Sequence, residues 1–146
     1  MTLQLPQAIH ATAVDIGGAG VIICGPSGAG KSDLAVRLID RGAILISDDQ
    51  VDIHSHEDDL LLKGPAQFAG MIEVRSLGIV TMSYLENTPL RLKINLTDNP
   101  PRYPLDRQIE TIMGRAITTI SLNAFEHSAP IKAELALRNA IADNHL

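Results

Sequence analysis

One stretch of eight residues constrains the fold of this chain more than any other feature. It matches the phosphate-binding pattern G-x-x-x-x-G-K-[ST] and reads Gly25-Pro26-Ser27-Gly28-Ala29-Gly30-Lys31-Ser32. A β-branched apolar run, Val21-Ile22-Ile23-Cys24, precedes it, and apolar residues at helical spacing follow it from Leu34 to Ile39. A strand, a glycine-rich loop and a helix in this order predict a P-loop within an α/β fold.

Each residue type in this loop suits the binding of a triphosphate. The glycines at 25, 28 and 30 allow backbone conformations in which successive N–H groups approach phosphate oxygens. The N-terminus of the following helix adds the positive end of its dipole. Lys31 can reach the β and γ phosphates, and the hydroxyl of Ser32 can bind Mg²⁺. We therefore assign all eight residues, 25–32, to nucleotide binding.

Composition limits the size of the fold and the class of partner. A chain of 146 residues with 45% hydrophobic content suits one domain over residues 1–146. The net charge is −5 and the 12 Lys and Arg residues are scattered, which argues against nucleic acid as a partner. Cys24 is the sole cysteine, which excludes an internal disulfide. Without a membrane-length segment or a signal-peptide pattern, we expect a cytoplasmic protein with no membrane partner.

The rest of the pattern predicts a mixed sheet flanked by helices. A second apolar run, from Ala43 to Ile46, completes a βαβ unit whose two strands we expect to be parallel. Residues 90–96 alternate apolar and polar side chains, which is typical of a strand with one face toward solvent. A last helix is expected from Ser128, as its cap, to about Ala140. Further strands are expected over residues 51–54, 60–62, 71–79 and 117–122.

Two adjacent carboxylates, Asp48 and Asp49, follow the second strand. At the carboxyl end of the sheet they would lie beside the bound triphosphate. One can support Mg²⁺ and the other can accept a proton from an attacking hydroxyl, because neighbours on a strand point to opposite faces. Glu73 and Arg75 share one face of the strand predicted over 71–79. This second pair can serve metal and phosphate or form an exposed ion pair, and spacing alone favours neither.

Three further segments carry weaker signals. His54 and His56 belong to an acidic turn, which we interpret as a solvated hairpin tip rather than a metal site. His10 follows the apolar Ile9 and, taken alone, has the pattern of a structural histidine. The proline-rich loop that starts at Asn99 leads to Arg107. Such loops can carry an active-site arginine, although a surface role is commoner.

Together these residues resemble one family, the bacterial HPr(Ser) kinase/phosphorylase, which modifies a seryl residue of the phosphocarrier protein HPr. The resemblance runs from about Ile9 to Arg107. It rests on the order of His10, the loop 25–32, Arg41-Gly42, Asp48-Asp49 and the run 72–79. It implies the nucleotide-binding fold of the HPr kinase C-terminal domain, which is similar to that of phosphoenolpyruvate carboxykinase. It also implies an ATP- and Mg²⁺-dependent serine protein kinase that acts on HPr and forms a homo-oligomer, a hexamer in the family.

The same resemblance implies roles for individual residues. Asp49 would be the general base in phosphorylation and the general acid in the reverse reaction, and Lys31 and His10 would also be catalytic. Arg107 would act on the transferring phosphoryl group, and Arg75 would support the site. Ser32 and Glu73 would hold Mg²⁺, and we expect Asp48 to complete this metal set.

The chain departs from the family pattern in three places. Some nine residues precede His10, where full-size members carry a further domain, so the chain resembles a short form. Ser76 stands where Gly is common. The basic stretch associated with dephosphorylation has no counterpart near residues 121–126, so we expect kinase activity to predominate over phosphorylase activity. Two other function classes stay open: a small-molecule or carboxykinase-like phosphotransferase, and a nucleotide-sensing module without catalysis.

Overall fold

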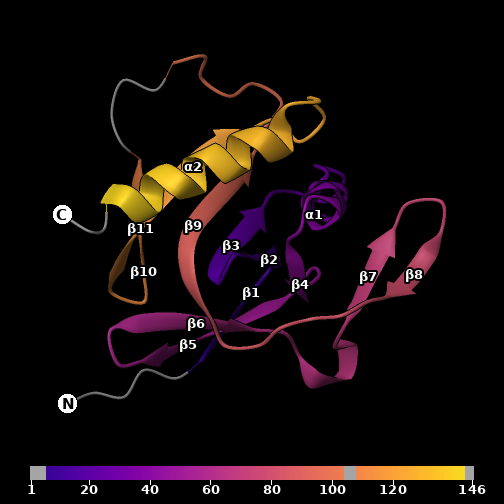
Figure 1. Cartoon of the computed structure of the whole chain (residues 1–146), viewed down its shortest axis with the longest axis horizontal. Helices are drawn as coiled ribbons and strands as arrows, with labels where there is room; N and C mark the ends of the chain where they lie inside the picture. The colour runs from indigo at the N-terminus through magenta and orange to yellow at the C-terminus, as the bar shows by residue number, and fades with distance from the viewer. Residues whose placement is uncertain (1–5, 104–107, 144–146) are drawn as a thin grey trace.

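The computed structural model describes residues 6–103 and 108–143, and a mixed sheet forms its centre (Figure 1). In chain order the elements are β1 (Gln7–Ile9), β2 (Thr12–Ile16), β3 (Ala19–Cys24), α1 (Lys31–Asp40), β4 (Ile44–Ser47), β5 (Val51–His56), β6 (Asp59–Lys63), a 3₁₀ turn (Ala66–Phe68), β7 (Met71–Val74), β8 (Gly78–Thr81), β9 (Thr88–Leu96), β10 (Ile109–Ile112), β11 (Arg115–Leu122) and α2 (Ala129–Asp143). The predicted mixed sheet and the last helix, which begins directly after Ser128, are confirmed.

The long strand β9 organises the sheet. The strand order is β1-β5-β6-β9-β3-β2-β4, with β11 also beside β9 and β10 beside β11. The pairs β3·β9 and β9·β11 are parallel, and the remaining pairs are antiparallel. β6 pairs with the start of β9, whereas β11 pairs with its end. The sheet therefore curls along β9, as Figure 1 shows.

The strands on either side of α1 have the predicted relative direction, but they are not neighbours. β2 lies between β3 and β4 and is antiparallel to both, so β3 and β4 run parallel to each other. The tight turn from β2 to β3 uses Gly17 (φ 62°) and Gly18 (φ 92°), a conformation that favours glycine. Asp15 stabilises this turn by accepting a 2.8 Å hydrogen bond from the Gly18 N–H. The sequence patterns did not predict β1, β2 or β10.

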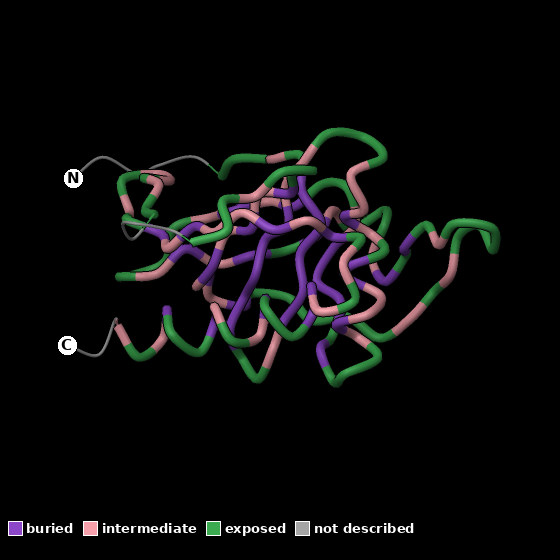
Figure 2. The backbone as a smooth tube through the Cα atoms, turned by 90° about the horizontal axis from the view of Figure 1, so that it is seen from above, coloured by how far each residue is buried: buried purple, intermediate pink, exposed green. Residues whose placement is uncertain are grey.

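Two apolar cores lie on the two faces of the sheet. Both helices pack on one face, where Leu34 and Leu38 of α1 and Leu137 of α2 are buried with residues of β3 and β9. The opposite face holds a second core, which includes Ile22 and Ile53. Strands rather than helices cover that second face, and Figure 2 shows the buried stretches enclosed by exposed ones. The helices therefore flank the sheet on one side only.

The alternation predicted over residues 90–96 is present, but its polar face is not open to solvent. Residues alternate between buried and half-buried throughout β9. The polar side is partly covered because β10 lies against it: Lys93 of β9 forms a 2.5 Å ion pair with Glu110 of β10. The polar side of β9 is therefore half-buried rather than exposed.

The single strand predicted over residues 71–79 is wrong, because this segment forms the hairpin β7–β8. Ser76 adopts φ 74° and Gly78 adopts φ 89°, and the N–H of Leu77 donates to the carbonyl of Val74 at 2.9 Å. These left-handed conformations reverse the chain where a continuous strand was expected. Arg75 consequently lies in the turn and does not share a strand face with Glu73. The hairpin projects from the body in both views (Figures 1 and 2).

Candidate active site

The glycine-rich loop joins β3 to α1 and is held tightly against the sheet. Gly28 (φ 85°) and Gly30 (φ 96°) adopt left-handed conformations that favour glycine. A side chain at Gly25 would have its Cβ 3.1 Å from the Cβ atoms of both Ala29 and Leu96. The predicted strand, loop and helix are therefore present in the predicted order, and the loop ends at the N-terminus of α1.

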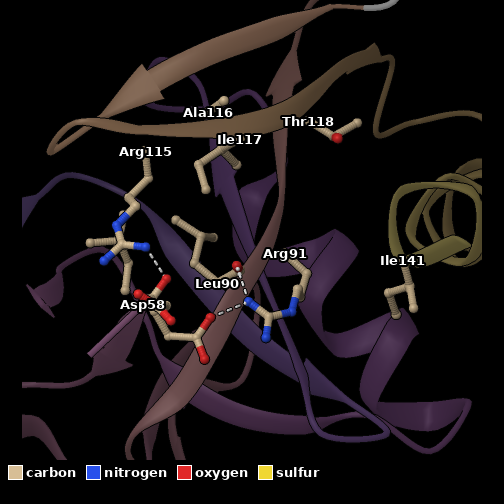
Figure 3. A pocket seen from close by; sticks show the side chains of 10 residues that line it. Asp58, Leu90, Arg91, Arg115, Ala116, Ile117, Thr118 and Ile141 are labelled. Atoms are coloured by element: carbon tan, nitrogen blue, oxygen red, sulfur yellow. Dashed lines mark hydrogen bonds and ion pairs between the residues drawn. The ribbon is translucent and has the colours of Figure 1, made fainter. Parts of the chain in front are cut away.

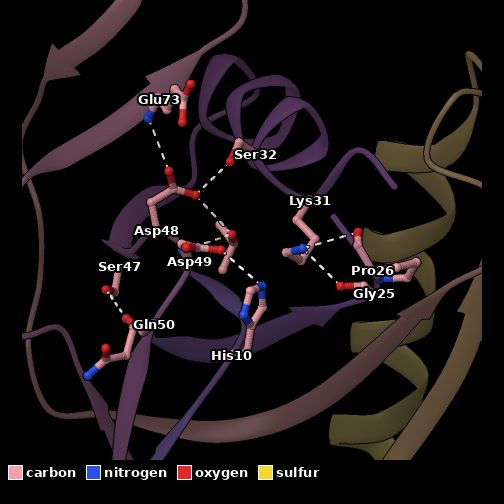
Figure 4. A network of polar contacts seen from close by, with 11 residues as sticks. His10, Gly25, Pro26, Lys31, Ser32, Ser47, Asp48, Asp49, Gln50 and Glu73 are labelled. Atoms are coloured by element: carbon pink, nitrogen blue, oxygen red, sulfur yellow. Dashed lines mark hydrogen bonds and ion pairs between the residues drawn. The ribbon is translucent and has the colours of Figure 1, made fainter. Parts of the chain in front are cut away.

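Lys31 places its charge over the loop backbone. The residue is 8% exposed, and its Nζ donates to the carbonyl oxygens of Gly25 at 2.9 Å and Pro26 at 3.3 Å (Figure 4). These two contacts hold the long side chain along the loop instead of leaving it free in solvent. The cation therefore lies beside the loop backbone that the sequence pattern predicts to bind phosphate.

Asp48 receives hydrogen bonds from three different elements. Its Oδ1 accepts from Ser32 Oγ of α1 at 2.6 Å and from Thr12 Oγ1 of β2 at 2.9 Å. Its Oδ2 accepts from the backbone N–H of Glu73 in β7 at 3.0 Å. Since three donors orient one carboxylate, Asp48 is positioned beside the first turn of α1 (Figure 4).

Asp49 faces a different partner. Its Oδ1 lies 3.0 Å from Nε2 of His10, and both side chains are largely exposed. Asp49 has φ 67°, a left-handed conformation that is uncommon outside glycine and costs about 1–3 kcal/mol, and such conformations cluster at functional sites. A shallow hollow of about 230 Å³ borders this pair and is lined by Ala8, Ile9, His10, Asp49 and Gln50. The two adjacent carboxylates therefore contact separate side chains, although both lie beyond the end of β4 and strand alternation does not explain the separation.

The residues around Asp48 fit a magnesium ion that also binds phosphate. A carboxylate and a hydroxyl converge there, and Mg²⁺ prefers hard oxygen ligands, usually one or two carboxylates together with substrate phosphates and water. Within the described ranges, no group of three or more His, Cys, Asp or Glu side chains is arranged to hold a metal by itself. A magnesium ion here would take further ligands from phosphate.

Thr12 was missed by the sequence reasoning. It is fully buried, and its hydroxyl donates to Asp48 and accepts the backbone N–H of Asp49 at 3.3 Å, so it links the two carboxylates. The sequence did contain a signal for the strand that carries Thr12. The segment from Ala11 to Ile16 is followed by Gly17-Gly18, a pair that is typical of a hairpin turn after a strand.

Other predicted site residues lie less close to this centre. The backbone of Glu73 contacts Asp48, but the residue is exposed. His54 and His56 belong to the hairpin β5–β6, and Nε2 of His56 lies 4.0 Å from the carboxylate of Glu57. Arg107 lies outside the described residues.

Among the helices that the structure describes, none is long and apolar enough to cross a membrane.

A larger pocket of about 380 Å³ opens elsewhere, beside Leu90 and Arg91 at the beginning of β9 (Figure 3). Its two arginines are engaged by the protein itself. Arg91 pairs with Asp59 at 2.8 Å, and Arg115 donates to the backbone carbonyls of Glu57 and Asp58. These contacts tie the hairpin β5–β6 to β9 and β11, so we interpret this pocket as a structural junction.

The chain is similar to known proteins over most of its length. Residues 2–133 match the family model described as HPr Serine kinase C-terminal domain. The HPr kinase/phosphorylase of Lactiplantibacillus plantarum is 36% identical over 109 residues, which cover 69% of this chain and 35% of that protein. The HPr kinase/phosphorylase of Clostridium botulinum is 35% identical over 126 residues, with coverage of 78% and 41%. The chain thus spans less than half the length of these relatives.

A solved structure extends the similarity to nearly the whole fold. The Hpr(Ser) kinase/phosphatase from Coxiella burnetii superposes with a TM-score of 0.83 at 27% identity, over 95% of this chain and 93% of that one. The expected HPr kinase type of fold is confirmed. Because the family model covers most of the sequence, from the first strand into α2, the chain belongs to the HPr serine kinase C-terminal domain family.

Proposed function

We propose that this chain transfers the γ-phosphoryl group of ATP, with Mg²⁺, to a seryl hydroxyl of an HPr-type phosphocarrier protein. Membership of the family supports the reaction class. The observation that carries the proposal is the separation of two consecutive carboxylates: Asp48 contacts Ser32 at the loop, whereas Asp49 contacts His10 beside an open hollow. This separation supports a donor side at Asp48 and an acceptor side at Asp49.

On the donor side, the loop and Lys31 would bind the phosphates. Phosphoryl transfer needs positioning and charge neutralisation more than covalent help from the protein. Ser32 and Asp48, 2.6 Å apart, would hold Mg²⁺ together with phosphate oxygens, and the ion would supply charge neutralisation when bound. Glu73, whose backbone already contacts Asp48, would contribute its carboxylate to the same metal set.

On the acceptor side, Asp49 would act as general base. The seryl oxygen forms a bond to the γ-phosphorus, the bond from that phosphorus to the β–γ bridging oxygen breaks, and ADP leaves with the electron pair. The seryl proton passes to a carboxylate oxygen of Asp49. His10 Nε2, at 3.0 Å, would hold this carboxylate in place toward the hollow. Arg107 would stabilise the charge on the transferring group.

The test is direct phosphorylation with the purified chain. Labelled ATP, Mg²⁺ and an HPr-type phosphocarrier are incubated with wild-type protein, and the modified residue is mapped. We expect label on a seryl residue and none on a carrier in which that serine is replaced by alanine. Label that appears only on small molecules would favour a small-molecule kinase, and nucleotide binding without any transfer would favour a sensing module. Size-exclusion chromatography of the same sample tests the proposed homo-oligomer.

A further inference from the structure

A large aromatic side chain lies exposed against the phosphate loop. Phe125 is 58% exposed, although the chain has only two phenylalanines and a 3% aromatic content. A methyl group at Gly30 would lie 3.3 Å from two carbons of its ring, so the ring lies near the last glycine of the loop and leaves little room for a side chain there. This exposed ring lies next to the predicted phosphate loop and belongs to neither of the two apolar cores.

The protein fixes the backbone on both sides of Phe125. Arg37 of α1 donates through Nη1 to the carbonyl of Glu126 at 3.1 Å and through Nη2 to the carbonyl of Ala124. The backbone N–H of Phe125 itself donates to Oδ1 of Asn123 at 3.0 Å. The two residues that flank Phe125 are therefore fixed to α1, which limits where its exposed ring can lie.

Phe125 lies on the opposite side of the loop from the proposed acceptor. The sheet order β9-β3-β2-β4 puts β3, which carries the loop, in the middle. Asp48 and Asp49 follow β4 on one side, whereas Phe125 follows β11, which pairs with β9 on the other side. Figure 1 shows the corresponding arrangement, with α1 between β4 and the start of α2. If the γ-phosphate faces Asp49, the nucleoside end of the triphosphate leaves the loop toward Phe125.

We propose that Phe125 is the platform on which the base of the bound nucleotide stacks. The inference rests on the proposed function, because it assumes a triphosphate in the loop. An aromatic ring offers its face to any nucleobase, so the ligand class is a nucleoside triphosphate rather than an inorganic polyphosphate. Phe125 is a binding residue in this proposal and takes no part in the bond changes.

The test compares ATP with inorganic tripolyphosphate, both with Mg²⁺, by calorimetric titration. Loss of one stacking contact lowers affinity by about tenfold, so we expect Phe125→Ala to bind ATP about tenfold more weakly. Its affinity for tripolyphosphate should match the wild type, because tripolyphosphate has no base. Phe125→Tyr should retain ATP affinity. Phe68→Ala is the matched control, since Phe68 is 52% exposed in the 3₁₀ turn Ala66–Phe68.

A fluorescence measurement provides a second readout. The sequence contains no tryptophan, so Phe125→Trp creates a single tryptophan at the proposed platform, and its emission can be excited apart from that of the two tyrosines. ATP should quench its emission, and tripolyphosphate should not. Unchanged ATP affinity in Phe125→Ala, or an equal loss of tripolyphosphate affinity, overturns the platform. If wild-type protein binds neither ATP nor tripolyphosphate, the proposed phosphate site is wrong as well. If it binds both compounds and Phe125→Ala does not weaken ATP binding, only the stacking platform is wrong.

Discussion

The Oγ atom of Ser32 lies 2.6 Å from Oδ1 of Asp48, which joins the first turn of α1 to the end of β4. The hydroxyl donates to a carboxylate that also accepts from Thr12 and from the backbone of Glu73. A ligand pair oriented in this way needs little rearrangement to bind a metal, because the surrounding contacts already fix the carboxylate. The contact therefore makes Ser32 the most direct probe of the proposed magnesium site.

Replacement of Ser32 by alanine should raise the magnesium requirement of the transfer reaction. The variant keeps the helix but removes one oxygen ligand, and we expect half-maximal rate at roughly 10- to 100-fold higher Mg²⁺ concentration. The measurement is the initial transfer rate across a Mg²⁺ titration. Ser55→Ala, at an exposed position of β5, is the control. An unchanged titration curve for the alanine variant at position 32 contradicts the metal assignment.

Lys31→Ala should abolish transfer and weaken ATP binding. Lys31 is the cation held along the loop by the carbonyls of Gly25 and Pro26, so its loss removes the charge that would face the phosphates. The fold should survive, as judged by circular dichroism, because the core clusters do not depend on this side chain. Lys63→Ala, at the exposed end of β6, controls for the change in net charge. Wild-type turnover in the variant at position 31 would falsify the phosphate-loop assignment.

Asp49→Asn should bind Mg²⁺-ATP normally but lose about a hundredfold or more in transfer rate, the scale of a general base. Asparagine tolerates the φ of 67° found at this position, so the backbone should be preserved. Single-turnover kinetics with saturating carrier separates the chemical step from binding. Asp48→Asn is the comparison, and its defect should appear in Mg²⁺ dependence instead. If only the variant at position 48 loses the chemical step, the two roles are reversed.

Alkylation of Cys24 should be slow and shifted to higher pH in the folded protein. Burial raises the pKa of the Cys24 thiol, and only the thiolate reacts. A free cysteine has a pKa of about 8.5, so at pH 8 the folded protein contains less thiolate than the unfolded chain. Iodoacetamide labelling across a pH series measures the midpoint for each state. The same midpoint in folded and urea-unfolded protein would contradict a buried environment for this sulfur.

Reversal of the reaction should be weak. In the reverse reaction that the family resemblance implies, inorganic phosphate would attack the phosphoseryl group to give pyrophosphate and the free serine, and a second anion would have to bind near the loop. The segment 121–126 contains no basic residue, and it carries Phe125 on a turn fixed by Arg37 instead. Seryl-phosphorylated carrier, phosphate and Mg²⁺ provide the assay, with pyrophosphate release as the readout. Release as fast as the forward reaction would show that another segment supplies the missing contacts.

Local patterns predicted most of the elements because their signals were strong. The loop 25–32, helix α1 and the alternation along β9 could be predicted from glycine placement and hydrophobic period. The hairpin β7–β8 was not, because a left-handed serine at Ser76 breaks a run that is otherwise typical of one strand. Strand β2 was also missed, although its β-branched residues Thr12, Val14 and Ile16 favour a strand, and its place between β3 and β4 depends on long-range pairing.

The phosphate loop, the two carboxylates after β4 and the family to which they point could be predicted from the chain alone, because each depends on residue types at short spacing. Which carboxylate contacts which partner depends on the three-dimensional fold. Thr12, Ser32 and Glu73 reach Asp48 from three elements, and His10 reaches Asp49 from the other side. These contacts join residues that are far apart in the chain, so they depend on how the sheet curls and pairs, which no local pattern records.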